Sequence, residues 1–205
     1  MARVSAERVQ QTKRDLLAAA RLVLTRDGLA NLSTRAVAKA ADTQMSQIQY
    51  HFGSKEGLLL ALFEDMNLRL VLRQRETFEN PELTVSQKWF LACDYLEEDL
   101  ASGYVQVLQE LIAAGWSNAR IADVTRAGLS HWHDLITGLA EEFEDKHGSF
   151  SPFSPKEIAS LVSSAFIGAE ALILLGYENT DHPVRTALRR VGEVMAEIEE
   201  SSTGG

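Results

Sequence analysis

The sequence contains few of the features that indicate a disulfide-stabilised, secreted or membrane protein. Cys93 is its single cysteine, which excludes an intrachain disulfide and a site built from several thiolates. Residues 1–11 contain no apolar run of the kind that a signal peptide needs. The most apolar stretch, residues 158–176, is interrupted by serines and by Glu170, so we expect no membrane span. These absences predict a soluble, cytoplasmic protein.

Helix breakers are also scarce, because the four prolines all lie after position 80 of the 205 residues. The hydrophobic period is helical almost throughout, and no stretch alternates as a strand would. The sequence therefore predicts an all-α fold of about nine helices. We expect them at residues 6–27, 34–41, 45–51, 55–78, 84–102, 104–114, 118–145, 155–177 and 184–200, followed by a disordered tail at 201–205.

Charge divides the chain unevenly, although the net charge is −9. Residues 1–57 carry nine Lys or Arg and five Asp or Glu, whereas residues 58–205 carry eleven and twenty-four. Such asymmetry is typical of a basic docking module joined to an acidic body. We therefore expect a DNA-binding domain at 1–57 and a helical regulatory and dimerisation domain at 58–200.

Two short helices, 34–41 and 45–51, joined by a tight turn and preceded by a longer helix, are typical of a helix-turn-helix. Small Ala38 and Ala41 permit close approach of the short helices, and Val37 and Ile48 supply apolar contact. The second helix would then be held rigidly enough to enter a DNA major groove. The same geometry occurs in helical proteins that never bind DNA, so a purely structural role is an alternative.

Polar groups of two kinds surround the second short helix. Glutamine can bond adenine in bidentate fashion, so the polar side chains at the helix start are equipped to read base edges; these are Gln44, Ser46, Gln47 and Gln49. Other side chains nearby can bind phosphate oxygens, namely Thr34, Arg35, Tyr50, His51 and Lys55. Together they form the candidate DNA-binding site.

Residues 12–62 resemble the N-terminal domain of the TetR (tetracycline-repressor-like) family. The matching positions are Thr12, Lys13, Ala18, Ala19, Ala20, Gly28, Ser33, Thr34, Arg35, Val37, Ala38, Ala41, the run from Tyr50 to Lys55, Leu58 and Leu59. The resemblance implies a homodimer formed through the last two helices, residues 45–51 in the major groove, and a ligand bound in the C-terminal domain. Most members of the family are repressors that the ligand releases from DNA.

The resemblance also assigns roles to single residues. Thr34, Arg35, His51 and Lys55 match positions that contact the DNA backbone. Positions that read bases are matched by Gln44, Met45, Ser46 and Gln47. The sequence departs from the family at Asp42, where a glycine is usual, and at Gln49, where a tyrosine often contacts phosphate. These departures suggest an operator unlike those of better-known members.

Two patterns in the C-terminal half predict a dimer interface. Apolar residues recur at alternating spacings of four and three, which forms a seam for another helix or for the chain's own core; they are Val184, Leu188, Val191, Met195 and Ile198. Residues 158–176 are apolar or small on nearly every side, so that helix is expected to be buried between its own domain and a partner. Ser163 and Ile167 are assigned to this interface.

Large apolar side chains in the middle of the chain could line a ligand pocket. We assign to it Trp89, Cys93, Tyr104, Trp116, Trp132, Phe166 and Glu170. A filled core is the alternative for the aromatic residues and Cys93. Glu170 interrupts an apolar run, so it faces either a ligand or the dimer interface.

No nucleophile elbow, phosphate-binding loop or HExxH motif is present, so we predict neither catalysis nor a cofactor. His131 and His133 are two residues apart and fall on different sides of a helix, which argues against a metal site. The sequence predicts a homodimeric regulator of double-stranded operator DNA that an unknown small molecule releases. The alternative is a ligand-independent regulator or an activator with the same mode of DNA binding.

Overall fold

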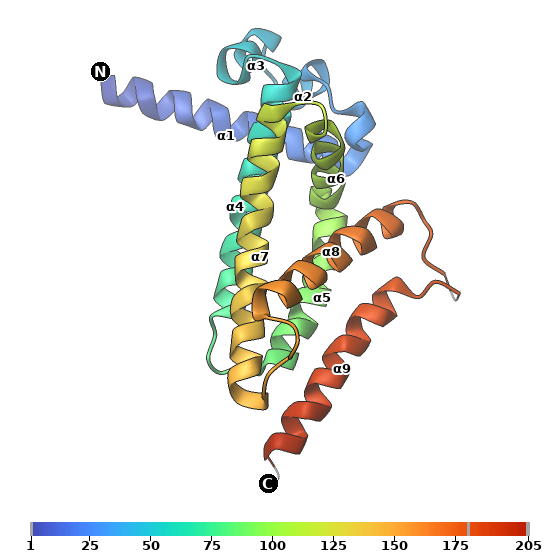
Figure 1. Cartoon of the computed structure of the whole chain (residues 1–205). Coiled ribbons are helices and arrows are strands. Elements are labelled where there is room, and N and C mark those ends of the chain that lie inside the picture. Colours follow the sequence, from blue (N-terminus) through green and yellow to red (C-terminus); the bar gives the residue numbers. More distant parts are fainter. Residues whose placement is uncertain (1, 180, 204–205) are drawn as a thin grey trace. The chain divides into compact units, whose positions relative to one another are not determined.

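The computed structural model describes residues 2–179 and 181–203, shown in Figure 1, and these residues contain helices and loops but no strand. The helices are α1 (Ala2–Asp27), a 3-10 helix η1 (Leu29–Asn31), α2 (Thr34–Ala40), α3 (Met45–Phe52), α4 (Lys55–Phe78), α5 (Val85–Ser102), α6 (Tyr104–Gly115), α7 (Ala119–His147), α8 (Pro155–Leu174) and α9 (Val184–Thr203). The all-α prediction of about nine helices is confirmed for the described part of the chain.

Capping groups in the sequence set most helix boundaries. The Ser33 hydroxyl accepts a hydrogen bond from the amide of Ala36 at 3.1 Å, which satisfies one free amide at the start of α2. At the start of α8, Ser154 and Glu157 form a reciprocal capping box with Pro155 at the first helical position. Gly28 ends α1 with a φ of 79°, a left-handed conformation that glycine adopts without strain.

Two helix ends differ from the expectation. The helix at α8 ends at Leu174, before the predicted position 177, where the chain turns through Gly176 with a φ of 68°. Helix α9 continues to Thr203, so the predicted disordered tail is wrong for residues 201–203. His147 contacts the Ser202 hydroxyl at 3.0 Å and holds this last turn. Positions 204 and 205 lie outside the described residues.

The chain packs as two compact units. Unit 1 comprises Met1–Leu68 and Asp99–Val124, and unit 2 comprises Arg69–Glu98 and Thr125–Gly205. Helices α4, α5 and α7 each contribute residues to both units. The expected functional domains, 1–57 and 58–200, are different segments and stay a prediction.

Unit 1 is built around the inward faces of α1 to α4. Its buried side chains include Leu16, Val23, Leu24, Val37, Ile48, Leu62 and Phe63. Gly103, between α5 and α6, lies against α1, because a Cβ at this position would come within 2.8 Å of Leu24. The rings of Phe63 and Tyr104 stack with their centroids 5.7 Å apart. The short helices α2 and α3 are therefore fixed to a rigid core.

Unit 2 has an aromatic core crossed by one buried ion pair. Trp89 and Trp132 both make edge contacts with Phe166, at centroid distances of 5.5 Å and 5.2 Å. Lys88, of whose side chain only 2% is exposed, pairs with Glu142 at 2.6 Å. Among the described residues, α8 alone is long and apolar enough to cross a membrane by length and composition. A single such helix is a weak indication, because core helices and interface helices share its composition.

Candidate nucleic-acid interface and ligand groove

Helix α3 is held by its inward face and by the turn that precedes it. Ile48 is buried on α3 and Val37 is buried on α2. In the turn, the amide of Thr43 donates to the carbonyl of Ala38 at 2.9 Å. Asp42 has a φ of 48° and is the one non-glycine residue with positive φ in the part of the chain that the structure describes. The turn thus adopts the conformation for which the family usually has glycine.

The outward face of α3 carries the side chains expected to read DNA. Tyr50 is 72% exposed and Met45 is 52% exposed. The other exposed polar residues of this segment are Gln44, Ser46, Gln47 and Gln49. An exposed row of amides and hydroxyls on a rigid helix is what direct recognition of base edges requires.

The residues expected to bind phosphate lie around α3. Arg35, in the first turn of α2, and Lys55, in the first turn of α4, are exposed, whereas Thr34 and His51 are half-buried. Burial lowers the pKa of His51, and the nearby positive charge of Lys13 lowers it further. Near pH 7 His51 is therefore mainly neutral, so a phosphate contact from it would be a neutral N–H hydrogen bond.

An open, polar depression separates α3 from the N-terminal half of α1. It has a volume of about 430 Å³ and is lined by Arg8, Val9, Thr12, Thr43, Gln47, Tyr50 and His51. We call it the α1–α3 depression. The sequence reasoning missed Arg8 because it lies before the helix-turn-helix motif. Its spacing of four from Thr12, which puts both on one helix face, was the available signal.

The arrangement of α1 to α4 agrees with a comparison to known families. The model of the tetR family of bacterial regulatory proteins matches residues 16–62. The chain belongs to the TetR family. It is 28% identical over 152 residues to the HTH-type transcriptional regulator UidR of Escherichia coli K12, an alignment that covers 70% of this chain and 71% of UidR. The protein is accordingly a DNA-binding transcriptional regulator.

Solved structures of TetR-family size share the fold of the regulator. A transcriptional regulator from Saccharomonospora viridis in complex with choline has a TM-score of 0.71 and 21% identity, with 92% of this chain and 96% of that chain covered. FadR of Bacillus subtilis in complex with stearoyl-CoA has a TM-score of 0.68 and 14% identity, with 89% and 96% covered. At these identities the likeness shows the fold alone.

Three residues assigned to a ligand pocket are buried in unit 2 of the regulator. Trp89, Cys93 and Phe166 are each at most 5% exposed. The indole N–H of Trp89 donates to the carbonyl of Leu188 at 2.7 Å. Burial raises the pKa of the Cys93 thiol to about 11. These contacts match the filled core that the sequence left open as an alternative.

Two other residues of the expected pocket lie in unit 1. Tyr104 is buried there and donates from its hydroxyl to Asn67 at 2.9 Å. Trp116 is 84% exposed, which contradicts the expectation that it lines a pocket. It follows the C-terminal end of α6, where the short loop to α7 leaves its ring outside the core.

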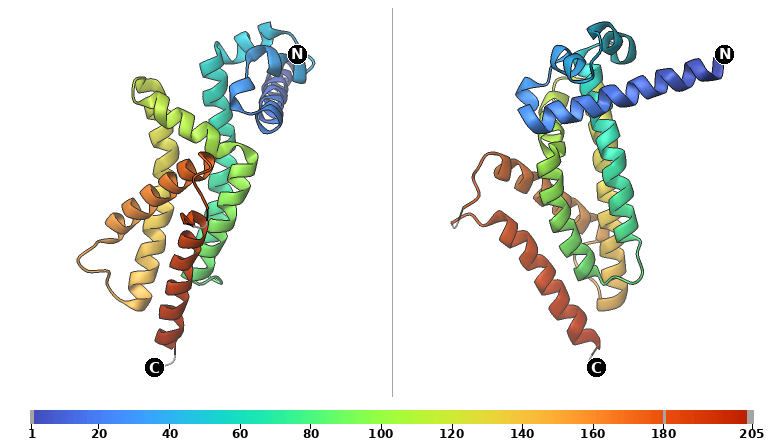
Figure 2. Two further views of the ribbon diagram at one scale, coloured as in Figure 1. Left: turned by 90° about the vertical axis from the view of Figure 1, so that its right-hand side faces the viewer. Right: turned by 180° about the vertical axis from the view of Figure 1, so that it is seen from behind.

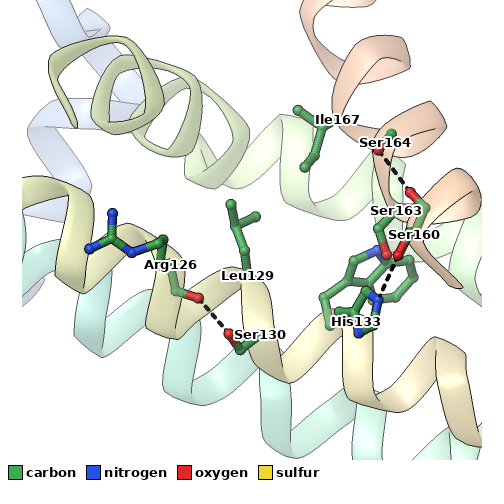
Figure 3. Close-up of a pocket in the computed structure, with 9 residues that line it drawn as sticks. Arg126, Leu129, Ser130, His133, Ser160, Ser163, Ser164 and Ile167 are labelled. Atoms are coloured by element: carbon green, nitrogen blue, oxygen red, sulfur yellow. Dashed lines mark hydrogen bonds between the residues drawn. The ribbon is translucent and has the colours of Figure 1, made fainter. Parts of the chain in front are cut away.

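A groove of about 360 Å³ lies between α7 and α8, as Figure 3 shows. Its lining residues on α7 are Arg126, Leu129, Ser130, Trp132 and His133, and those on α8 are Ser160, Ser163, Ser164 and Ile167. Of the residues assigned to the ligand, it contains Trp132. Ser163 and Ile167, assigned to the dimer interface, line this groove within one chain, so that assignment is not supported by where they lie.

Hydrogen bonds leave the α7–α8 groove rich in acceptors. The hydroxyls of Ser130 and Ser164 donate to the carbonyls of Arg126 and Ser160, at 2.9 Å and 2.8 Å. Ser160 donates to Lys156, so its contact with His133 Nε2 at 3.1 Å needs an imidazole N–H donor. Ser163 is 9% exposed, and its buried Oγ has no hydrogen-bond partner.

The exposed apolar surface of unit 2 follows one face of α8 and one face of α9. It consists of Leu161, Leu172 and Leu175 on and just after α8, and Val191, Val194 and Ile198 on α9. We call it the α8–α9 stripe. Val191 and Ile198 were assigned to the interface from sequence.

The other members of the predicted seam are turned away from the α8–α9 stripe. Leu188 is buried, and Gly192, one turn later, lies against Trp89 and Phe90. For Leu188 the structure therefore supports the open alternative, a side packed on the chain's own core. Val184 and Met195 are half-buried. Glu170 is also half-buried and is not among the residues that line the groove.

Proposed function

We propose that the regulator is a homodimeric repressor that places α3 of each protomer in the major groove of a near-palindromic operator and is released by a small molecule in the α7–α8 groove. The observation that carries the proposal is the rigid, outward-facing polar surface of α3 on the Ile48 anchor. The regulator acts by binding alone, with no catalytic step and no cofactor.

Two groups of residues divide the work at the DNA. Gln44, Met45, Ser46 and Gln47 read bases, since they are exposed at the N-terminal end of α3, the end that recognition helices present to base edges. Arg35 and Lys55, at the starts of α2 and α4, bind phosphates beside them. In each case the helix N-terminus adds free amides that favour an anion.

The α8–α9 stripe supports dimerisation. Leu175 is 79% exposed and Val194 is 55% exposed. A contiguous apolar face of this kind marks an interaction surface. A second copy would cover the stripe about a twofold axis, which would place two α3 helices on half-sites separated by about 34–36 Å or a multiple of it.

The α7–α8 groove indicates the chemistry of the effector. Ser130 and Ser164 present oxygen lone pairs because their protons are donated to helix carbonyls, and no carboxylate lines the groove. The effector would therefore be an uncharged small molecule with hydroxyl or N–H donors and an apolar face against Trp132, Leu129 and Ile167. Choline and stearoyl-CoA, bound by proteins of the same fold, support a small-molecule effector in general terms.

Release from DNA would follow from a shift in population. The effector can weaken DNA binding only by preferring a conformation in which the two α3 helices do not fit successive major grooves. Helices α4, α5 and α7 run through both units, so they are the covalent route for this coupling.

Selection of bound sequences from random DNA duplexes tests the proposal. We expect near-palindromic sites, and we expect Gln47→Ala to relax preference at particular base pairs while Arg35→Ala and Lys55→Ala weaken all sites. Equal weakening of every site by Gln47→Ala would contradict the docking of α3.

A compound screen by thermal midpoint, with the DNA complex as readout, tests the effector. Compounds that stabilise the protein and dissociate it from DNA support release. If binding compounds leave the DNA complex intact, the alternative of a ligand-independent regulator or an activator is favoured.

A further inference from the structure

The N-terminal half of α1 extends past α2 and α3, as both views of unit 1 in Figure 2 show. The α1–α3 depression lies where this half of α1 runs beside α3. Arg8, Val9 and Thr12 form its wall on α1, and Gln47, Tyr50 and His51 form its wall on α3. The depression is thus bounded by residues already expected to bind DNA.

The period of α3 shows which part of its surface faces α1. Successive residues turn by about 100°, so with Ile48 pointing inward, Gln47 and His51 fall on one flank and Met45 and Gln49 on the other. Tyr50 lies close to the outward face, next to the Gln47 flank. Helix α1 therefore borders the Gln47 flank.

The dimensions of DNA bring phosphates to both flanks of an inserted helix. A helix with its side chains is about 10–12 Å across, which nearly fills a major groove about 12 Å wide. The two sugar–phosphate strands then run along the sides of the helix. A strand on the Gln47 flank of α3 would have to pass the α1–α3 depression.

The depression offers hydrogen-bond donors and positive charge to such a strand. Arg8 is exposed and carries five N–H donors, and the Tyr50 side chain is 72% exposed. Thr12 donates its hydroxyl proton to the Arg8 carbonyl at 3.0 Å, so it shapes the wall and is not the donor. Lys13 lies near enough to His51 to lower its pKa, and none of the lining residues is acidic.

We infer that Arg8 binds a backbone phosphate of the operator on the Gln47 flank of α3, with the Tyr50 hydroxyl as a second donor to the same phosphate group. Helix α1 is then a DNA-contacting element in its own right, beside α2, α3 and the first turn of α4. The inference rests on the proposed docking of α3 in the major groove.

The test compares two charge-matched variants of the full-length protein, Arg8→Ala and Arg14→Ala. Arg14 is also exposed on α1, bonds Gln11 at 2.8 Å and does not line the depression. Fluorescence anisotropy would measure binding to a selected operator duplex and to a scrambled duplex at several salt concentrations. Thermal midpoints of both variants serve as the folding control.

Arg8→Ala is expected to weaken binding to both duplexes by about tenfold, the loss expected for a charged hydrogen bond. It should also reduce the slope of log affinity against log salt by about 0.9, the value for one lost phosphate contact. Arg14→Ala should bind within about twofold of the wild type, and Arg8→Lys should recover part of the loss. Ethylation interference should lose one phosphate per half-site in Arg8→Ala.

Two outcomes separate the failure of this inference from the failure of the proposed function. If the wild type binds its operator while Arg8→Ala and Arg14→Ala have equal affinities and salt slopes, the inference alone is wrong. Loss of affinity in Arg8→Ala without a change in the interference pattern also overturns it, because the effect is then not a direct contact. A wild type that binds no duplex overturns both.

Discussion

At the scale of single residues, Asp42 combines backbone conformation with charge. It occupies a left-handed position in the turn before α3, with a φ of 48°. Aspartate and asparagine tolerate this conformation better than most residues because their short side chains can bond locally. Unlike glycine, however, aspartate places a negative charge beside the face that meets DNA.

Asp42→Asn is therefore expected to bind operator DNA severalfold more tightly at low salt, with a difference that shrinks as salt rises. Its free energy of unfolding should match that of the wild type. Asp42→Ala serves as a control, since it also removes the charge but should lose about 1 kcal/mol of stability in the left-handed turn. Anisotropy titrations and urea melts measure both effects. Equal DNA affinities of Asp42→Asn and the wild type at low salt would contradict this role.

Ser163 is the second residue with a measurable consequence. Its Oγ is buried without a hydrogen-bond partner, so the folded state bears the cost of desolvating a hydroxyl. Ser163→Ala should raise the free energy of unfolding by about 1 kcal/mol. Ser164→Ala, on an exposed position of the same helix, should leave it unchanged. A destabilised Ser163→Ala would indicate that the hydroxyl has a partner in solution.

Cys93 should behave as a core residue. Its thiol is buried and has a pKa of about 11, so the reactive thiolate is scarce near neutral pH. We expect a thiol reagent at pH 8 to label the native protein at least a hundredfold more slowly than the urea-unfolded protein, because only about one thiol in a thousand is ionised. Fast labelling of the native protein would contradict this burial.

At the scale of helices, the contact between α5 and α7 depends on a buried charge. Lys88 pairs with Glu142 at 2.6 Å, and Glu142 also pairs with Lys146 at 2.7 Å. Glu142→Gln would leave Lys88 buried and uncompensated, and should lower the free energy of unfolding by roughly 3 kcal/mol. Lys88→Met should change it by only about 1 kcal/mol, because Glu142 is partly exposed and keeps Lys146. Urea denaturation distinguishes these results, and equal losses would contradict the asymmetry.

Glu142 also makes this contact sensitive to acid. Burial raises its pKa, but hydrogen bonds from Lys146 and Lys88 outweigh burial and lower the pKa below its usual value. A lowered pKa in the folded state means that the stabilisation is present above the unfolded value of about 4.3 and is lost as pH falls through the folded value. The thermal midpoint of Glu142→Gln should therefore fall less between pH 5 and 3, values of about the range concerned, than that of the wild type.

The ends of the helices could be predicted from sequence, whereas the faces they present could not. Ser33, Ser154 and Gly28 act within one turn of their own position, so their effect is local and visible in the sequence. Leu188 and Val191 share one apolar period, yet Leu188 is buried and Val191 is exposed. Hydrophobic period indicates burial but not whether the chain itself or a partner provides it.

The groove was harder to predict for the same reason. His133 and Ser160 meet although 27 residues separate them, and only the packing of α7 on α8 brings them together. Trp116 has the composition of a pocket residue but follows a helix end that leaves it exposed. The DNA-reading surface was predicted better, because its residues lie within one short segment whose spacing the family preserves.

At the scale of the whole molecule, the α8–α9 stripe should determine the oligomeric state. Val194→Asp would place a charge at the centre of the proposed interface, which should produce monomers in sedimentation experiments and weaken operator binding. Thr186→Asp, at an exposed position on the polar flank of α9, is the matched control and should remain dimeric. A dimeric Val194→Asp would show that another surface joins the protomers.

The division of the chain into two units affects how its binding specificity could be re-engineered. Unit 1 contains residues from two separate stretches, since Asp99–Val124 packs with Met1–Leu68. A chimera with a single crossover after position 57 would keep Leu24 from one parent and Gly103, its packing neighbour, from the other. Exchange of DNA-reading modules between relatives should therefore succeed more often when both stretches are transplanted as a set.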